Sequence, residues 1–185
     1  MNVDYYLNER EQYLISKIDL DKLPPNHIKD LLVNKEGYPI NILSLESDLQ
    51  VIVRELQRQG YYFTSIKNIN DSSILKYDKA NQRVSIHPDI DLGSKICFNE
   101  LIVAGTRLTK NLVVSRELTL KKGEIITPDS IEELNQKLAG LGLFATHRVT
   151  PYIIYGEVEN SCVKTNLLVQ VKEKEFGVGE IASIS

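Results

Sequence analysis

The stretch "LNQKLAGLGLFATHRVTPY", residues 134–152, begins as a helix and ends as a strand. Leu134, Leu138 and Leu141 recur at intervals of three and four residues, which is the spacing of one buried helix face. Gly140 and Gly142 end the helix, because glycine permits the left-handed turn that closes many helices. Residues 143–154 are rich in aromatic, β-branched and apolar side chains and predict a strand.

The helix begins upstream at Thr127, which is a suitable N-cap, with Pro128 at the first helical position. Residues 44–69 repeat the whole design. They predict a helix over 44–60 with Ser44 as N-cap and Gly60 as stop, followed by a strand over 61–69. The predicted buried stripe of this helix comprises Leu45, Leu49, Ile52, Val53 and Leu56.

The elements around these two helices also occur in pairs. Strands are predicted at 13–20 and 97–105, shorter helical segments at 24–37 and 109–123, and closing strands at 83–91 and 165–174. The order β-α-α-β-β therefore occurs twice, with a period of about 80 residues. Following the chain direction through one unit predicts an α+β fold in which two helices cover one face of a three-stranded mixed sheet, ordered first-third-second.

Composition limits the classes of function. The 185 residues are 42% hydrophobic and 25% charged, with a net charge of −3, which is typical of globular domains and does not favour nucleic acid as a partner. No apolar run approaches the ~20 residues of a membrane-spanning helix. The three histidines, His27, His87 and His147, lie in unrelated elements without ligand-like spacing. The sequence therefore predicts no enzyme, no metal site and no cofactor.

The order and spacing of several motifs in residues 95–174 resemble a POTRA (polypeptide-transport-associated) domain of the BamA/TamA family of outer-membrane protein insertases. The motifs are the strand end Leu101-x-Val103-x-Gly105, "SREL" from Ser115 with Leu120 and Gly123, "LGLF" over 141–144, and "VKE" over 171–173. Residues 13–92 resemble the same domain more weakly, through "LQRQGYYF". The tail "FGVGEIASIS" resembles the start of the family's first barrel strand.

The resemblance and the repeat together divide the chain into four parts. Residues 1–10, in which Val3, Tyr5 and Leu7 alternate, are predicted to be the last strand of a preceding unit. Residues 11–93 and 94–175 are the two predicted POTRA domains. Residues 176–185 are predicted to begin the link to a C-terminal membrane barrel.

The resemblance implies a periplasmic binding and scaffold module of an outer-membrane protein. Its implied partners are unfolded outer-membrane protein clients and accessory proteins of the assembly complex; the alternative is a POTRA module of a two-partner secretion transporter. The available mechanism is β-augmentation, in which an extended client adds a strand to a free sheet edge. The predicted edges comprise Phe63, Thr64, Ser65, Ile66, Lys67, Asn68 and Ile69, and Ala145, Thr146, His147, Arg148, Val149, Thr150 and Tyr152.

Two cysteines stand at the starts of predicted neighbouring strands. Cys97 and Cys162 could approach each other, and an oxidising compartment would permit a disulfide. Against a bridge, Cys162 is out of phase with Leu167 and Val169, whereas Cys97 is in phase with Leu101. The sequence leaves the pairing open.

Overall fold

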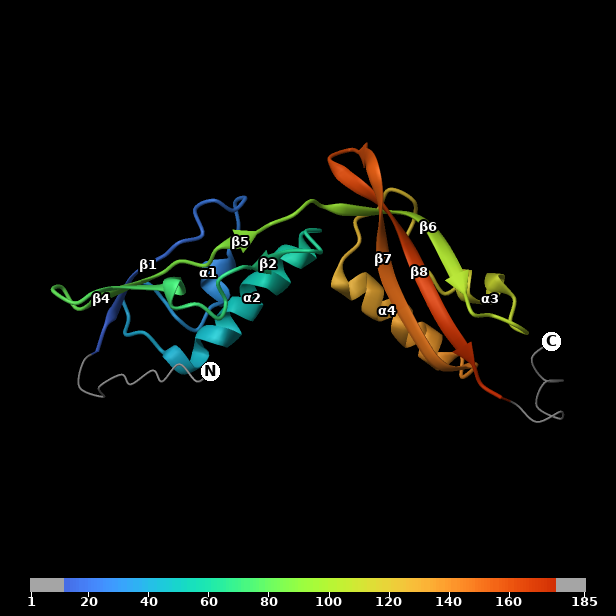
Figure 1. The fold of residues 1–185 in the computed structure, drawn as a ribbon, viewed down its shortest axis with the longest axis horizontal. Coiled ribbons are helices and arrows are strands. Elements are labelled where there is room, and N and C mark those ends of the chain that lie inside the picture. The colour runs from blue at the N-terminus through green and yellow to red at the C-terminus, as the bar shows by residue number, and fades with distance from the viewer. Residues whose placement is uncertain (1–11, 176–185) are drawn as a thin grey trace. The chain divides into compact units, whose positions relative to one another are not determined.

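The structure is a computed structural model that describes residues 12–175 (Figure 1). The chain divides into two compact units. Unit 1 contains the described residues up to Gln57 together with Phe63–Gly93, and unit 2 contains Arg58–Tyr62 and the described residues from Ser94 onward. The predicted strand at residues 3–8 and the predicted start of a barrel at 176–185 lie outside the described residues.

Unit 1 contains a three-stranded sheet in the order β1-β4-β3, in which β4 is parallel to β1 and antiparallel to β3. A separate two-stranded ladder joins β2 to β5. The elements of the unit are β1 (Leu14–Ile18), α1 (Ile28–Leu31), η1 (Ile42–Ser44), α2 (Leu45–Arg58), β2 (Ser65–Ile66), η2 (Ser72–Ile74), β3 (Leu75–Asp78), β4 (Arg83–Ile86) and β5 (Ile90–Asp91).

Unit 2 contains one sheet in the order β6-β8-β7, in which β8 is parallel to β6 and antiparallel to β7. Its elements are β6 (Ile96–Ala104), α3 (Asn111–Ser115), α4 (Pro128–Gly140), β7 (Phe144–Glu159) and β8 (Cys162–Glu173). The sheet of unit 2 has the predicted order, first-third-second, whereas the sheet of unit 1 has this order only with the unpredicted strand β3 in second place. The α+β class is confirmed. Helix α4 lies along the sheet (Figure 1), and its Leu134 and Leu138 share one core with Val169.

The predicted N-cap of α4 is confirmed, and the predicted N-cap of α2 is wrong. Thr127 forms a capping box with Ser130 at the start of α4, and Pro128 is its first residue, as predicted. Ser44 is not the N-cap of α2. The side chain of Asn41 instead accepts the Ser44 N–H and begins the 3₁₀ turn η1, which runs directly into α2.

The strand predicted over residues 61–69 is wrong in extent, because only Ser65–Ile66 form β2. Aromatic residues suggested a strand there, but Tyr62 packs against the core of unit 2. Asn68 then ends the ladder: its side chain donates to the carbonyl of His87 (3.0 Å) and accepts the N–H of Asp89 (2.8 Å). The second strand of the first sheet is β3.

A repeated hydrogen-bonded turn covers the outer side of the first strand in each unit. In unit 1 the N–H of Gly37 donates to the carbonyl of Ile15 (2.7 Å), and Ile15 donates to Tyr38 (2.9 Å). In unit 2 the N–H of Gly123 donates in the same way to Phe98 (2.7 Å). Gly37 and Gly123 have φ values of 86° and 89°, which glycine adopts without strain.

Candidate functional site

Strand β7 forms the long outer edge of the sheet in unit 2. It pairs with β8 from Thr146, opposite Lys172, to Ile153, opposite Thr165, without a register shift. Within residues 12–175 no other strand pairs with it. A row of backbone N–H and C=O groups along its other side is therefore open to a further strand.

The position of Pro151 indicates which residues of β7 direct their backbone N–H and C=O groups to the open side of the sheet. It stands opposite Leu167 in the ladder. Because proline has no N–H, a strand tolerates it where its nitrogen points away from the neighbouring strand. Backbone direction alternates along a strand, so His147 and Val149 also present their N–H and C=O groups to the open side. Thr146, Arg148 and Thr150 direct theirs to β8.

The side chains of β7 alternate between the two faces of the sheet. Val149 is buried against α4 and β8, and His147 is half-buried on the same face. Thr146, Arg148 and Tyr152 lie on the other face, where Tyr152 is 60% exposed. The predicted residues 145–152 thus lie on one continuous edge strand, with polar and aromatic side chains toward solvent.

The predicted residues 63–69 do not form such an edge. Phe63 and Ile69 are exposed but lie outside β2. Thr64 is buried, and its hydroxyl donates to the carbonyl of Leu92 (2.9 Å). The N–H of Lys67 donates to the carbonyl of Asp89 (2.8 Å), and its ammonium pairs with Asp91 (3.3 Å). Much of this segment's hydrogen-bonding capacity is already satisfied within unit 1.

A disulfide joins Cys97 in β6 to Cys162 in β8, with the Cα atoms 5.7 Å apart. The phase argument against this bridge was wrong because the ladder is irregular between Phe98 and Leu101. This irregularity reverses the phase of β6, so that Cys97, like Cys162, lies on the face opposite the helices. The bridge holds the start of β6 against the start of β8, next to the β7–β8 hairpin.

The carboxylate of Glu173, at the end of β8, is held by the loop after β6. It accepts the backbone N–H groups of Arg107 (3.0 Å), Leu108 (3.0 Å) and Thr109 (2.7 Å). Burial by itself raises the pKa of Glu173, but these three donors outweigh it and lower the pKa from 4.5 to about 2. The charge of Glu173 therefore has a structural role, and the "VKE" motif contains it.

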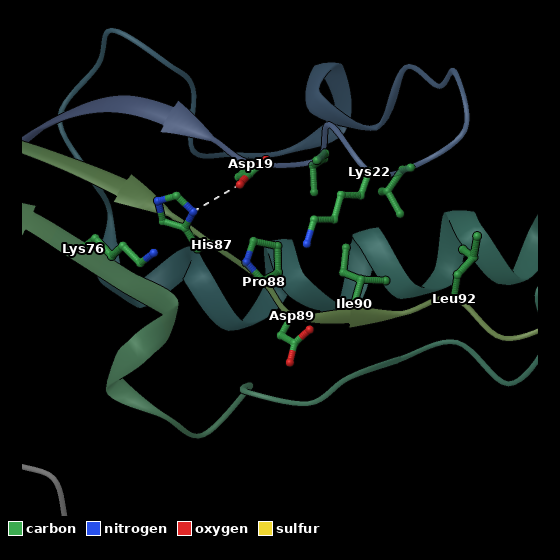
Figure 2. Close-up of a pocket in the computed structure, with 10 residues that line it drawn as sticks. Asp19, Lys22, Lys76, His87, Pro88, Asp89, Ile90 and Leu92 are labelled. Carbon is green, nitrogen blue, oxygen red and sulfur yellow. Dashed lines mark hydrogen bonds and ion pairs between the residues drawn. The ribbon is translucent and has the colours of Figure 1, made fainter.

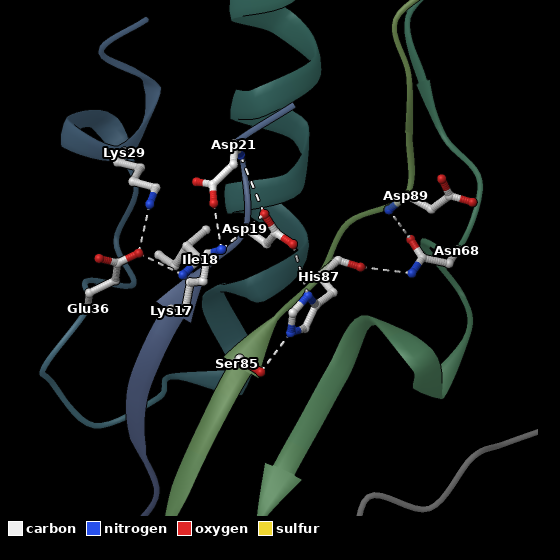
Figure 3. A network of polar contacts seen from close by, with 10 residues as sticks. All are labelled: Lys17, Ile18, Asp19, Asp21, Lys29, Glu36, Asn68, Ser85, His87 and Asp89. Carbon is white, nitrogen blue, oxygen red and sulfur yellow. Dashed lines mark hydrogen bonds and ion pairs between the residues drawn. The ribbon is translucent and has the colours of Figure 1, made fainter. Parts of the chain in front are cut away.

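Sequence reasoning missed a polar cluster in unit 1. Nδ1 of His87 lies 3.3 Å from an Asp19 oxygen, and Nε2 lies 2.7 Å from the hydroxyl of Ser85 (Figure 3). Parallel pairing of β1 with β4 places Ile18 opposite Ile86, so the next residues, Asp19 and His87, become neighbours. The spacing of Ser85 and His87, two residues apart on one strand, is the signal that could have indicated the cluster.

The cluster borders a cavity of about 320 Å³ (Figure 2). The cavity is lined by Asp19, Leu20, Lys22, Leu23, Lys76, His87, Pro88, Asp89, Ile90 and Leu92. The order Asp–His–Ser is that of a serine hydrolase triad, but Ser85 does not line this cavity. The contacts among Asp19, His87 and Ser85 instead link the end of β1 to the end of β4.

No group of three or more His, Cys, Asp or Glu side chains within residues 12–175 is arranged to hold a metal ion. Each helix in this range is also too short or too polar to cross a membrane.

The chain is similar in sequence to one curated protein and in fold to several solved structures. No family model matches the chain. The curated "Outer membrane protein assembly factor BamA" of Neorickettsia risticii (strain Illinois) is 20% identical over 182 residues, which cover 96% of this chain and 23% of that protein. This chain thus spans about a quarter of its relative's length.

Two solved structures share the fold. Haemophilus influenzae BamA POTRA3-5 has a TM-score of 0.63 at 17% identity, over 88% of this chain and 61% of that one. Haemophilus ducreyi BamA lacking POTRA domains 1-3 has a TM-score of 0.64 at 18% identity, over 88% of this chain and 30% of that one. The fold of the chain is therefore that of tandem POTRA domains, and its sequence is similar to that of a BamA protein.

Proposed function

We propose that this chain is a periplasmic binding and scaffold module of an outer-membrane β-barrel protein insertase. It captures unfolded client proteins by β-augmentation and carries docking surfaces for accessory subunits. It is not an enzyme. The sequence match to an outer-membrane protein assembly factor supports the process, and the open edge of β7 supports the mechanism.

The single observation that carries the proposal is the alternation along β7. His147 and Val149 offer two complete N–H and C=O pairs to an incoming strand, whereas Pro151 offers only a carbonyl. A client strand can therefore pair for a few residues and must stop at Pro151. This limit suits transient capture and works against extended aggregation.

The expected affinity is low. Each backbone hydrogen bond contributes about 0.5–1.5 kcal/mol net, and ordering an extended client offsets much of that gain. A dissociation constant on the order of micromolar to millimolar follows. Weak binding serves an assembly factor, because the client must be released into the membrane. Residues 63–69 are the weaker candidate edge, since unit 1 already uses several of their backbone groups.

The test is to close the open side of β7 without disturbing its pairing with β8. The variant His147→Pro removes one outward N–H and leaves the β8 ladder intact. Binding of a fluorescent peptide copied from an outer-membrane β-strand should weaken about tenfold. This is the expected effect of losing roughly one hydrogen bond and of misaligning the adjacent one. Fluorescence anisotropy measures the change.

Arg148→Ala is the matched control, because it removes an exposed side chain at the adjacent position and leaves every backbone donor in place. Its affinity should stay within about threefold of the parent chain. A second control is the same peptide with alternate amides N-methylated, which should not bind. Equal binding by the parent chain and His147→Pro, with both folded, would refute capture at this edge.

A further inference from the structure

The cavity in unit 1 lies where a strand leaves one sheet and enters another. After Ile86 the chain departs from β4, and at Ile90 it joins the separate ladder with β2. Parallel strands β1 and β4 both end at this point, so the cavity opens beyond their carboxyl ends (Figure 2). Where neighbouring strands separate in this way, a crevice forms beyond their carboxyl ends, and such crevices are common ligand-binding sites.

Two cations from different elements line this cavity. Lys22 follows β1, and Lys76 lies in β3. Neither ammonium has an ion pair or hydrogen bond with another residue in the described part of the chain. Other lysines of the described chain are paired: Lys17 with Asp21 (2.6 Å), Lys29 with Glu36 (2.7 Å) and Lys137 with Glu133 (3.0 Å). Several exposed lysines outside the cavity, such as Lys79, resemble Lys22 and Lys76 in having no such partner within residues 12–175.

The acidic residues of the cavity do not neutralise these lysines. Asp19 is committed to His87 (3.3 Å) and Lys17 (3.6 Å). In Figure 2 the Asp89 carboxylate points away from Lys22 and His87. The cavity therefore combines the Lys22 and Lys76 ammonium groups with the Asp89 carboxylate and with an imidazole whose two ring nitrogens are already in contact with Asp19 and Ser85.

The remaining lining is apolar. Leu20 is 6% exposed and forms part of the unit 1 core, and Leu23, Ile90 and Leu92 pack against that core. We propose that this cavity binds a small carboxylate carried on a short apolar chain, with the Lys22 and Lys76 side chains supplying the positive charge of the site and the leucine and isoleucine side chains covering the apolar chain. At about 320 Å³ the space suits a ligand at the small end of protein pockets.

An NMR titration of the whole chain with hexanoate tests this site. Amide shifts should cluster at Asp19–Leu23 and His87–Leu92, with millimolar affinity that weakens as salt is added, since both lysines are solvent-accessible. Hexylammonium, which has the same apolar chain and the opposite charge, should not shift these amides. Equal shifts with hexylammonium, or none with hexanoate and acetyl-leucine, would overturn the proposal.

Acetyl-leucine and its amide distinguish the source of the carboxylate. If acetyl-leucine binds and the amide does not, a peptide chain end can occupy the site; if only hexanoate binds, the ligand is a free acid. The matched variants are Lys76→Glu and Lys79→Glu, which change the same charge in and beside β3, inside and outside the cavity. Lys76→Glu should weaken binding about tenfold and Lys79→Glu less than about twofold; equal effects would refute the assignment. Because the cavity lies in unit 1 and β7 lies in unit 2, the result of this test does not depend on whether clients bind to β7.

Discussion

At the scale of single residues, a few polar groups hold irregular backbone in place. Glu173 collects three N–H groups of the loop between β6 and α3. Asp48, which is 3% exposed, collects the N–H groups of Val33 (2.7 Å) and Asn34 (2.9 Å) in unit 1. Each carboxylate replaces water for backbone donors that have no strand or helix partner, and its loss would leave those donors unpaired.

The first prediction concerns Glu173 and pH. Because its folded-state pKa of about 2 lies below the ordinary 4.5, its ionisation stabilises the fold above pH 4.5, and this contribution disappears as the pH falls through about 2. Glu173→Gln should lower the free energy of unfolding by about 1–3 kcal/mol at pH 7. The difference should vanish near pH 2, as measured by urea unfolding across this range.

Glu175→Gln is the matched control, since Glu175 is exposed and lies beyond the end of β8. It should change the stability by less than about 0.5 kcal/mol at every pH. A pH-independent loss in Glu173→Gln would show that the side chain contributes by packing and not by its charge.

At the scale of elements, sequence patterns predicted what local chemistry determines. The stripe of α4, its Thr127 cap and the alternation of β7 and β8 follow from spacing alone. The second strand of unit 1 did not. The aromatic run at 61–63 has strand propensity, but Tyr62 belongs to a different core, and the true strand at 75–78 is short and polar. Tertiary packing overrode propensity there.

The candidate site shows the same division. Alternation predicted residues 145–152 as one strand, because a long sheet edge has a regular pattern. The His87 cluster depends on which residues the parallel register brings together, and the cysteine pairing depends on an irregularity between Phe98 and Leu101. Register and irregularity arise between strands, so a single strand's sequence does not contain them.

The second prediction concerns the bridge between β6 and β8. The two cysteines are 65 residues apart, and a cross-link of that span stabilises the fold by about 4 kcal/mol through restriction of the unfolded chain. The double variant Cys97→Ser, Cys162→Ser should lose about this amount in denaturant unfolding. Adding reductant should destabilise the parent chain equally and leave the variant unchanged; a reductant effect on the variant would contradict this account.

At the scale of the whole molecule, the sequence repeat corresponds to two hydrophobic cores. One core contains Ile15, Ile52 and Val84, and the other contains Ile96, Leu138 and Val169. The disulfide lies in unit 2, and the Asp48 cluster lies in unit 1. Perturbations of the two can therefore be assigned to separate cores.

The third prediction follows from this separation. Asp48→Ala should lower the unfolding free energy of unit 1 by about 2–4 kcal/mol, because buried N–H groups lose their acceptor. Hydrogen exchange should then accelerate at Val84 and stay unchanged at Val169, whereas reduction of the disulfide should have the opposite pattern. Equal acceleration at both residues after either change would mean that the two cores unfold as one.

The central claim is that a client strand adds to the open side of β7, and hydrogen exchange along this strand tests it most directly. In the free chain the amides of Arg148 and Thr150 should exchange slowly, because they face β8, and those of His147 and Val149 should exchange fast. A saturating β-strand peptide should slow His147 and Val149 selectively. If the peptide binds and these two amides continue to exchange at their free rate, the client is held elsewhere and β-augmentation at β7 is contradicted.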